Sequence, residues 1–168
     1  MRKMQSSYSI RPARLPADAS RITDIVGAVW KGGGDALVEA QYGQIGNAPW
    51  QHYQSKAVLD WIQSPTAQAY VVVDTEREGE IVAFCSFQID RDRDTATVGY
   101  NAFFPTHQGR GIGGLMMNYV MDRIRESGVG YAGVIVADND EHIPARRVYE
   151  KAGFQTVYGL RYMFQKLS

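Results

Sequence analysis

Hydrophobic and polar positions follow two different periods along this chain, and each change of period marks a predicted element. Apolar residues recur at helical spacing over residues 20–30, 51–63 and 112–124, which predicts helices there. Weaker patterns predict helices over residues 35–42 and 145–152. Short runs rich in β-branched and aromatic residues predict strands. These strands cover residues 8–12, 69–74, 80–89, 95–105, 131–136 and 155–167.

The order of these elements predicts the fold class. The link Thr75–Gly79 is short and polar and contains one glycine, which favours an antiparallel hairpin between its flanking strands. Consecutive strands in the middle of the chain, with helices before and after them, are typical of an α+β arrangement. We therefore expect a mixed, mostly antiparallel central sheet that is flanked by helices. The 168 residues contain no repeat or linker, so we expect a single domain over residues 1–168.

The segment Gln108–Gly113 lies between a predicted strand, which stops at Pro105, and the helix that begins at Ile112. It has glycines at alternate positions, starting from Gly109. Glycine lets the backbone pass close to a ligand, and the unpaired amides at a helix N-terminus attract anions. The segment is therefore typical of a loop that binds phosphate groups. A tight turn before a core helix would explain the same glycines without any ligand.

Two familiar nucleotide-binding motifs do not fit this loop. It lacks the Gly-Lys-Ser/Thr ending of a P-loop. It also lies two thirds of the way along the chain, and its glycines do not have the Gly-x-Gly-x-x-Gly spacing of a dinucleotide fingerprint.

A second informative segment follows the strand predicted over residues 131–136. Ala145–Phe154 reads as a short helix, with Pro144 near its first turn and Gly153 placed to end it. The two segments have the patterns Gln-x-x-Gly-x-Gly and Ala-x-x-x-Tyr-x-x-x-Gly-Phe, about thirty residues apart. In this order and spacing, the chain resembles the GNAT family of N-acetyltransferases. The resemblance extends over nearly the whole chain, and outside residues 95–154 it rests on the order of elements.

The resemblance implies the acyl-CoA N-acyltransferase fold, with acetyl-CoA as cosubstrate. It implies direct transfer of the acetyl group to a primary amine of a small-molecule or amino-acid-like acceptor. The loop amides would bind the cofactor pyrophosphate, with Arg110 as an additional cation, and the backbone around Phe103 and Phe104 would pair with the cofactor arm. The implied cofactor-binding residues are Phe103, Phe104, Gln108, Gly109, Arg110, Gly111, Ile112, Gly113 and Gly114.

Tyr149 is the implied catalytic residue, because the tyrosine of the second motif hydrogen bonds the cofactor sulfur in the family. A phenol has a pKa of about 10 and a thiol of about 8.5, so full proton transfer to the thiolate is uphill by about 2 kcal/mol. We therefore expect Tyr149 to stabilise the departing thiolate through a hydrogen bond. A tyrosine packed in the core beside Val148 is the alternative without a catalytic role.

The strand before the loop lacks the glutamate that many members of the family carry as a base. The corresponding position holds Thr97, which cannot serve as a base. An alkylamine with a pKa of about 10 is only about 0.1% neutral at pH 7, so a route for proton loss is needed. Glu39, Asp60, a histidine or an ordered water chain could supply it. This departure motivates a rival function, a catalytically weak acyl-CoA-binding or sensing module; a nucleotide-binding interaction domain is a third interpretation.

Aromatic residues gather in the first helices and their link, where the family usually builds its acceptor pocket. They are Trp30, Tyr42, Trp50, Tyr53 and Trp61. Such a pocket would suit a small amine, although core packing accounts for at least some of these side chains. His107, beside the loop, is expected to be exposed. His142 occupies the place of an asparagine that caps the next helix in relatives.

The composition of the chain limits which partners, metals and cellular compartment we expect. Eighteen basic and eighteen acidic residues cancel, so we expect neither nucleic acid nor a membrane as a partner, whereas a homodimer stays compatible. The only cysteine, Cys85, lies in an apolar run and is expected to be buried. One cysteine and three scattered histidines have no metal-ligand spacing, so no metal is expected. The chain shows neither a signal peptide nor an apolar stretch of membrane-spanning length, which predicts a cytoplasmic protein.

Overall fold

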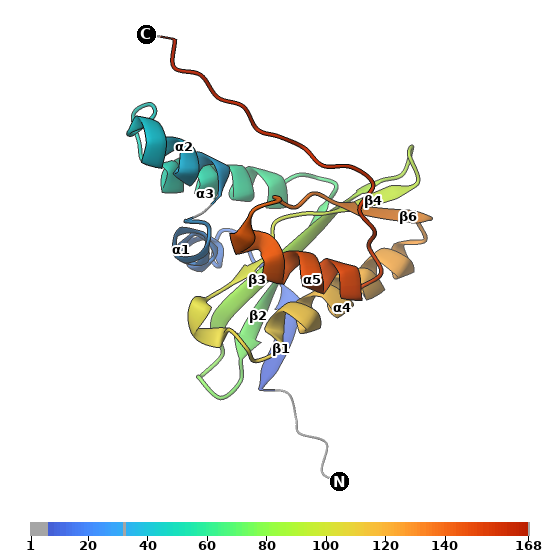
Figure 1. Ribbon diagram of the computed structural model, residues 1–168. Coiled ribbons are helices and arrows are strands. Elements are labelled where there is room, and N and C mark those ends of the chain that lie inside the picture. Colours follow the sequence, from blue (N-terminus) through green and yellow to red (C-terminus); the bar gives the residue numbers. More distant parts are fainter. Residues whose placement is uncertain (1–6, 32, 168) are drawn as a thin grey trace.

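The computed structural model describes residues 7–31 and 33–167, so residues 1–6, Gly32 and Ser168 lie outside the described part. Within this part, six strands form one sheet that helices cover (Figure 1). The strands are β1 Tyr8–Pro12, β2 Ala67–Asp74, β3 Glu80–Asp90, β4 Thr95–Val98, β5 Ala102–Phe103 and β6 Tyr131–Val134. The α-helices are α1 Ala19–Val29, α2 Gly34–Tyr42, α3 Trp50–Ile62, α4 Ile112–Ser127 and α5 Ile143–Lys151. The short 3-10 helices are η1 Pro105–His107 and η2 Asp140–His142.

The strand order is β1-β2-β3-β4-β6, and β5 also pairs with β3. Every paired set is antiparallel except β4 and β6, which run parallel with Thr95 opposite Tyr131 and Val98 opposite Val134. This arrangement confirms the predicted mixed, mostly antiparallel sheet, and β2 and β3 form the predicted hairpin. The strand predicted over residues 131–136 ends earlier, at Val134.

Successive side chains of β3 enter two separate cores, because the pleat sends neighbouring residues to opposite faces. Phe84 packs in one core with Ile22 of α1 and Val58 of α3. Cys85 packs in the other core with Val120 of α4. Helices α1 and α3 therefore cover one face of the sheet, and α4 and α5 cover the other (Figure 1). The predicted burial of Cys85 is confirmed at 1% exposure, and this burial raises the pKa of its thiol to about 12.

The strand predicted over residues 95–105 is interrupted by a bulge, which is why β4 and β5 are separate. β4 pairs with β3 as far as Phe87, and β5 pairs with it from Phe84. Residues 99–101 therefore face only residues 85–86 of the partner strand. One extra residue on one strand bends it and aims its side chains away from the regular pleat.

Local contacts hold the bulge in place. The N–H of Gly99 donates to the carbonyl of Ser86 at 2.9 Å, and Ser86 Oγ donates to the carbonyl of Tyr100 at 2.8 Å. A Cβ atom on Gly99 would lie 2.2 Å from Trp61 Nε1, so only glycine fits against this tryptophan. The bulge therefore fixes where Tyr100 and Asn101 lie.

The prediction of a strand over residues 155–167 is wrong. This C-terminal segment has no regular secondary structure and runs from the end of α5 past α2 (Figure 1). Met163 and Leu167 are 88% and 89% exposed. Alternating apolar residues predicted a strand, but a strand needs a hydrogen-bonded neighbour, and the segment does not join the sheet. Its ring contact with α2 is made by Phe164, whose centroid lies 5.4 Å from that of Tyr42.

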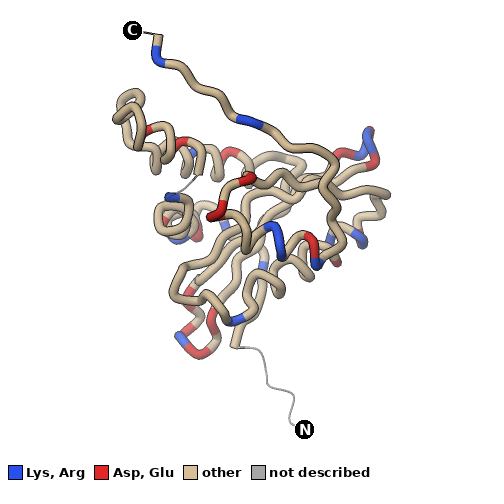
Figure 2. The backbone as a smooth tube through the Cα atoms, viewed as in Figure 1, with Lys and Arg blue, Asp and Glu red and all other residues tan. Residues whose placement is uncertain are grey.

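Basic and acidic residues are interspersed along the described chain (Figure 2). Several form ion pairs within one helix, such as Lys56 with Asp60 in α3 and Arg125 with Asp122 in α4. The charges therefore do not separate by sign in this view. Among the helices of residues 7–31 and 33–167, none combines the length and apolar character needed to cross a membrane.

Candidate active site

Residues Gln108–Gly114, named here the glycine loop, lead the chain from η1 into α4. Gly109 and Gly111 have φ angles of +78° and +76°, in the left-handed region that favours glycine. Gly111 comes immediately before α4, and its carbonyl accepts the first helical hydrogen bond from the N–H of Leu115 at 3.0 Å. The backbone conformation therefore requires glycine at these two positions.

The surface in front of the glycine loop is open. A Cβ atom on Gly109 or Gly111 would meet no described atom within 4 Å. No described side chain caps α4, and the amides from Ile112 to Gly114 precede the first helical donor. Unpaired main-chain donors at a helix N-terminus attract anions, and the exposed Arg110 adds a positive charge. This arrangement fits a diphosphate group.

The other predicted loop residues contribute in different ways. Gln108 is exposed, but its N–H donates to the carbonyl of Pro105 at 3.0 Å, so this amide belongs to η1. The side chain of Ile112 is in the core at 1% exposure and leaves only its amide to the loop. Gly114 is exposed, and a Cβ atom there would meet no described atom within 4 Å.

His107 was expected to be exposed, and this prediction is wrong, since the residue is only 2% exposed. Its Nδ1 is hydrogen bonded to the hydroxyl of Tyr8 at 2.9 Å, which ties the start of the glycine loop to β1. Burial, followed by the nearby positive charge of Arg110, lowers the pKa of His107. The sequence pattern missed this contact because its partner lies 99 residues away.

The two predicted phenylalanines differ in their main-chain groups. The N–H of Phe104 donates to the carbonyl of Val82 at 3.0 Å, and its carbonyl accepts from the N–H of His107 at 2.9 Å. Backbone groups alternate between the two edges of a strand, so those of Phe103 point away from β3. Among the described strands, β5 pairs only with β3. Of the two predicted residues, Phe103 therefore leaves its main-chain groups open, whereas those of Phe104 are engaged within the protein.

Gly113 is the point where α4, β5 and α5 meet. A Cβ atom there would lie 3.5 Å from Val148 Cγ2 and 3.6 Å from Phe103 Cε1. Tyr149 follows Val148 directly in α5. The open donors of the glycine loop, the open edge of β5 and the helix of Tyr149 are therefore neighbours.

Among the residues that the structure describes, the hydroxyl group of Tyr149 has one hydrogen-bond partner, the side chain of Asn101 in the bulge. Asn101 Nδ2 donates to Tyr149 Oη at 3.0 Å and to the carbonyl of Gly99 at 3.1 Å. A carbonyl only accepts, so the contact with Gly99 fixes the orientation of the Asn101 amide. The phenol oxygen thus acts as an acceptor, and its O–H hydrogen is available to donate to a ligand.

Two opposite effects act on the pKa of Tyr149. Burial raises it above its ordinary value, because the residue is 8% exposed and the phenolate would lose its hydration. The hydrogen bond from Asn101 lowers it by a smaller amount. The net increase keeps Tyr149 protonated at neutral pH, as a hydrogen-bond donor must be.

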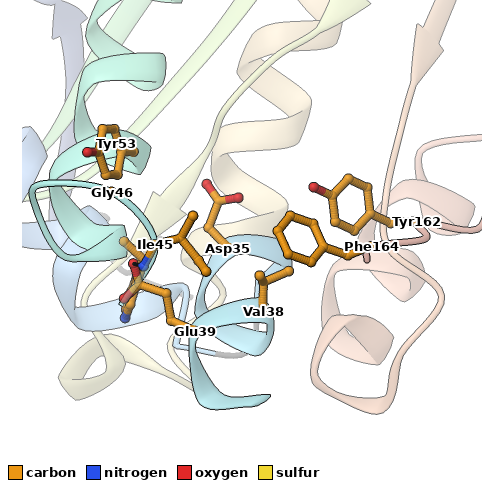
Figure 3. A pocket seen from close by; sticks show the side chains of 9 residues that line it. Asp35, Val38, Glu39, Ile45, Gly46, Tyr53, Tyr162 and Phe164 are labelled. Atoms are coloured by element: carbon orange, nitrogen blue, oxygen red, sulfur yellow. Dashed lines mark hydrogen bonds between the residues drawn. The ribbon is translucent and has the colours of Figure 1, made fainter. Parts of the chain in front are cut away.

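A cavity of about 340 Å³ opens between α2, α3 and the C-terminal segment (Figure 3). Trp50 and Tyr53 line it, which supports the predicted aromatic pocket. Trp30 and Trp61 lie elsewhere and contact the ring of Tyr100 edge-on, with centroids 5.7 and 5.8 Å apart. These two tryptophans therefore pack against the bulge.

A family model described as the acetyltransferase (GNAT) family matches residues 35–154. This stretch contains the bulge, the glycine loop and Tyr149. The chain belongs to the GNAT acetyltransferase family. Acetyl-CoA is the acetyl donor of this family, so membership confirms the resemblance, the acetyltransferase assignment and the cosubstrate.

Solved GNAT structures share the fold. The ribosomal-protein-S18-alanine N-acetyltransferase from Escherichia coli is 18% identical with a TM-score of 0.66, covering 90% of this chain and 79% of that chain. A chimera of the spermidine N-acetyltransferase SpeG from Vibrio cholerae and hSSAT is 16% identical with a TM-score of 0.63, covering 88% and 80%. AAC(6')-Iy in complex with the bisubstrate analogue CoA-S-monomethyl-acetylneamine is 11% identical with a TM-score of 0.61, covering 95% and 98%. No curated protein sequence matches the chain.

Thr97, which stands at the position of the usual base, and the two predicted carboxylates lie in different places in this GNAT structure. Thr97 is exposed on β4, opposite Gly133. Asp60 forms an exposed ion pair with Lys56, outside the cavity. Glu39 lines the cavity and is the only one of the two predicted carboxylates to do so.

The histidines named as alternatives have other surroundings. His52 is exposed and contacts the ring of Tyr53 edge-on. His142 is hydrogen bonded to Asn139 and does not cap α5 with its side chain. The sequence pattern also missed Asp35, which lines the cavity from the first turn of α2. Its role depends on how α2 faces the bulge, and local spacing carries no signal for that.

Proposed function

We propose that this GNAT protein transfers the acetyl group of acetyl-CoA directly to a primary amine of a small molecule. The observation that carries the proposal is the meeting of α4, β5 and α5 at Gly113. It brings the open main-chain amides before α4 next to the helix that holds Tyr149. A donor that has both phosphates and a thioester can then be held by one small region, which orients its reacting end.

Three parts of the chain have separate roles in this proposal. The amides of the glycine loop and the cation of Arg110 bind the pyrophosphate. The open edge of β5 at Phe103 orients the arm that carries the acetyl group, in the way that an added strand pairs with a sheet edge. Acetyl-CoA supplies the activated thioester. The cavity between α2 and α3 receives the amine.

Tyr149 supports departure of the thiolate by hydrogen bonding. An ordinary phenol is a weaker acid than a thiol by roughly 2 kcal/mol, and burial raises the pKa of Tyr149 further, so we do not require complete proton transfer. A neutral phenol that is held in place still stabilises negative charge as it develops. Asn101 is a positioning residue, because its amide engages the phenol oxygen and leaves the O–H to point at the sulfur.

Turnover with a panel of primary amines tests the proposal. The purified protein is mixed with acetyl-CoA and each amine, and both CoA release and the mass of the product are measured. We expect CoA release that requires the amine, together with a product heavier by one acetyl group. Thr97 in place of a carboxylate favours a second candidate, an acyl-CoA-binding or sensing module. Tight CoA binding without release for any amine would support that candidate instead.

A further inference from the structure

The cavity between α2, α3 and the C-terminal segment has aromatic and acidic walls. The described residues that give it this character are Asp35, Glu39, Trp50, Tyr53, Tyr162 and Phe164. None of the described residues that line the cavity is basic. Figure 3 shows the Asp35 carboxylate pointing into the space between Tyr53 on one side and Phe164 on the other.

The two carboxylates of the cavity are engaged differently. Glu39 Oε1 accepts the N–H of Ile45 at 3.3 Å and so supports the loop after α2. Asp35 forms no hydrogen bond or ion pair with the residues that the structure describes. Its charge is therefore available to a cationic ligand in the cavity.

The start of α2, which carries Asp35, is linked to the bulge through Trp30. The N–H of Gly33 donates to the carbonyl of Trp30 at 3.1 Å, and the Trp30 ring contacts that of Tyr100. Burial raises the pKa of Tyr100, and the negative charge of Asp35 adds to this increase. Tyr100 lies in the bulge next to Asn101, and Asn101 holds the hydroxyl of Tyr149. In the proposed function, a ligand bound at Asp35 would lie at the start of α2, the part of the cavity wall that is linked to the bulge.

The charge of the cavity discriminates between amine acceptors. An ammonium group is attracted by Asp35 and by the faces of the aromatic rings. A carboxylate in the same place would meet two negative side chains and no described basic one. The apolar walls suit a chain of methylene groups between the ends of the ligand.

We propose that this cavity binds an amine acceptor that carries a second ammonium group and no carboxylate, with Asp35 as the ion-pair partner of that group. The inference rests on the proposed acetyl transfer to a primary amine, and it narrows the acceptor from amines in general to diamines. Amino acids carry a carboxylate, so the inference predicts that they are not preferred acceptors.

Matched substrates test this inference, because cadaverine and lysine differ only by a carboxylate. The kcat/KM for each is measured with saturating acetyl-CoA. We expect cadaverine to be preferred over lysine by at least about tenfold, and putrescine over ornithine by a similar factor. Equal kcat/KM values within either pair would overturn the inference.

The variant Asp35→Asn tests the ion pair directly. It should raise the KM for cadaverine about tenfold, leave the KM for acetyl-CoA unchanged and reduce the preference for cadaverine over lysine. Asp24→Asn is the matched control, since it removes the same charge from the exposed face of helix α1, where the Asp24 side chain is 63% exposed. Equal effects of the two variants on the KM for cadaverine would contradict the role of Asp35.

A binding measurement separates this inference from the proposed function. Turnover of amines without a preference for diamines would refute the inference alone. If CoA binds but no amine is acetylated, the proposed function fails, and calorimetry with cadaverine in the presence of CoA still decides the inference. If the wild type binds cadaverine and Asp35→Asn binds it more weakly, the result supports the cavity as a diamine site. If the wild type does not bind cadaverine, the inference is refuted.

Discussion

The cofactor side of the site and its acceptor side differ in how firmly they are held. The glycine loop continues into α4, whose Ile112, Met116 and Val120 are each at most 3% exposed. On the acceptor side, α2 buries only Ala36, and Leu37 is 51% exposed. The C-terminal segment that completes the cavity has no regular secondary structure. The cofactor side is therefore built on the hydrophobic core, whereas α2 and the C-terminal segment on the acceptor side are lightly packed.

This difference corresponds to what each side binds. In the proposed function, main-chain amides recognise the donor, and their positions follow from the backbone of the glycine loop, so the donor site is tied to the fold. In the same proposal, the acceptor is recognised by side chains that line the cavity, such as Asp35 and Phe164, which the core does not constrain. Lightly packed elements can exchange such side chains at low cost in stability, so a common donor site can serve different acceptors.

Gly111→Asp should give the largest effect, on the cofactor side. The new side chain must adopt a φ of +76°, which costs about 1–2 kcal/mol, and it places a carboxylate against the phosphates. We expect CoA affinity, measured by calorimetry, to fall about 100-fold. Gly128→Asp is the control, because Gly128 has a φ of +79° with no described atom within 4 Å of its Cβ position, at the opposite end of α4. A similar loss of affinity in both variants would show that strain, and not the loop, is responsible.

Tyr149→Phe should act on turnover rather than on CoA binding. Removal of the hydroxyl deletes the hydrogen bond to the sulfur, so we expect kcat to fall about 30-fold while the KM for acetyl-CoA changes less than about twofold. Tyr70→Phe is the matched control, since Tyr70 is 9% exposed and its hydroxyl donates to Gln68 at 2.8 Å, outside the site. Unchanged kcat in Tyr149→Phe would remove this residue from the mechanism.

Phe164→Ala should weaken the acceptor side alone. The ring lines the cavity and packs against Tyr42, and its loss removes part of the apolar wall. We expect the KM for the amine to rise about fivefold, equivalent to about 1 kcal/mol, with CoA affinity unchanged. Leu167→Ala in the same segment, at 89% exposure, serves as control and should leave both values unchanged. A fall in CoA affinity for Phe164→Ala would mean that the two sides are not independent.

The substitution His107→Gln, next to the glycine loop, should give the smallest effect, which is a change in how the stability of the protein depends on pH. Its pKa is lowered in the folded protein, so its contribution is present above the unfolded value of about 6.5 and is lost as pH falls through the folded pKa. We expect the Tm of the wild type to fall by about 3 °C more between pH 7 and pH 5.5 than that of His107→Gln. Parallel Tm curves for the two proteins would exclude this contribution.

The sequence was most informative where structure depends on neighbours along the chain. The apolar periods predicted α1, α3 and α4, and the alternate glycines predicted the turn before α4, because both signals are local. The bulge at residues 99–101 was missed, since it depends on how Trp61 packs against Gly99.

Contacts between distant residues explain the remaining errors. Asn101 and Tyr149 are 48 residues apart, and Tyr8 and His107 are 99 apart, so neither pair has a local signature. The C-terminal segment shows the opposite case. Its alternation predicted a strand, but pairing with the sheet is a tertiary event that no period along the chain can establish.

The burial of Cys85 has a practical consequence for all of these experiments. The chain contains one cysteine, and its thiol is 1% exposed with a pKa of about 12, so disulfide-exchange dyes cannot label it while the protein is folded. When CoA release is followed with such a dye under native conditions, every colour change therefore comes from liberated coenzyme. In denaturant, the same dye should react once per chain, which makes the enzyme its own concentration standard.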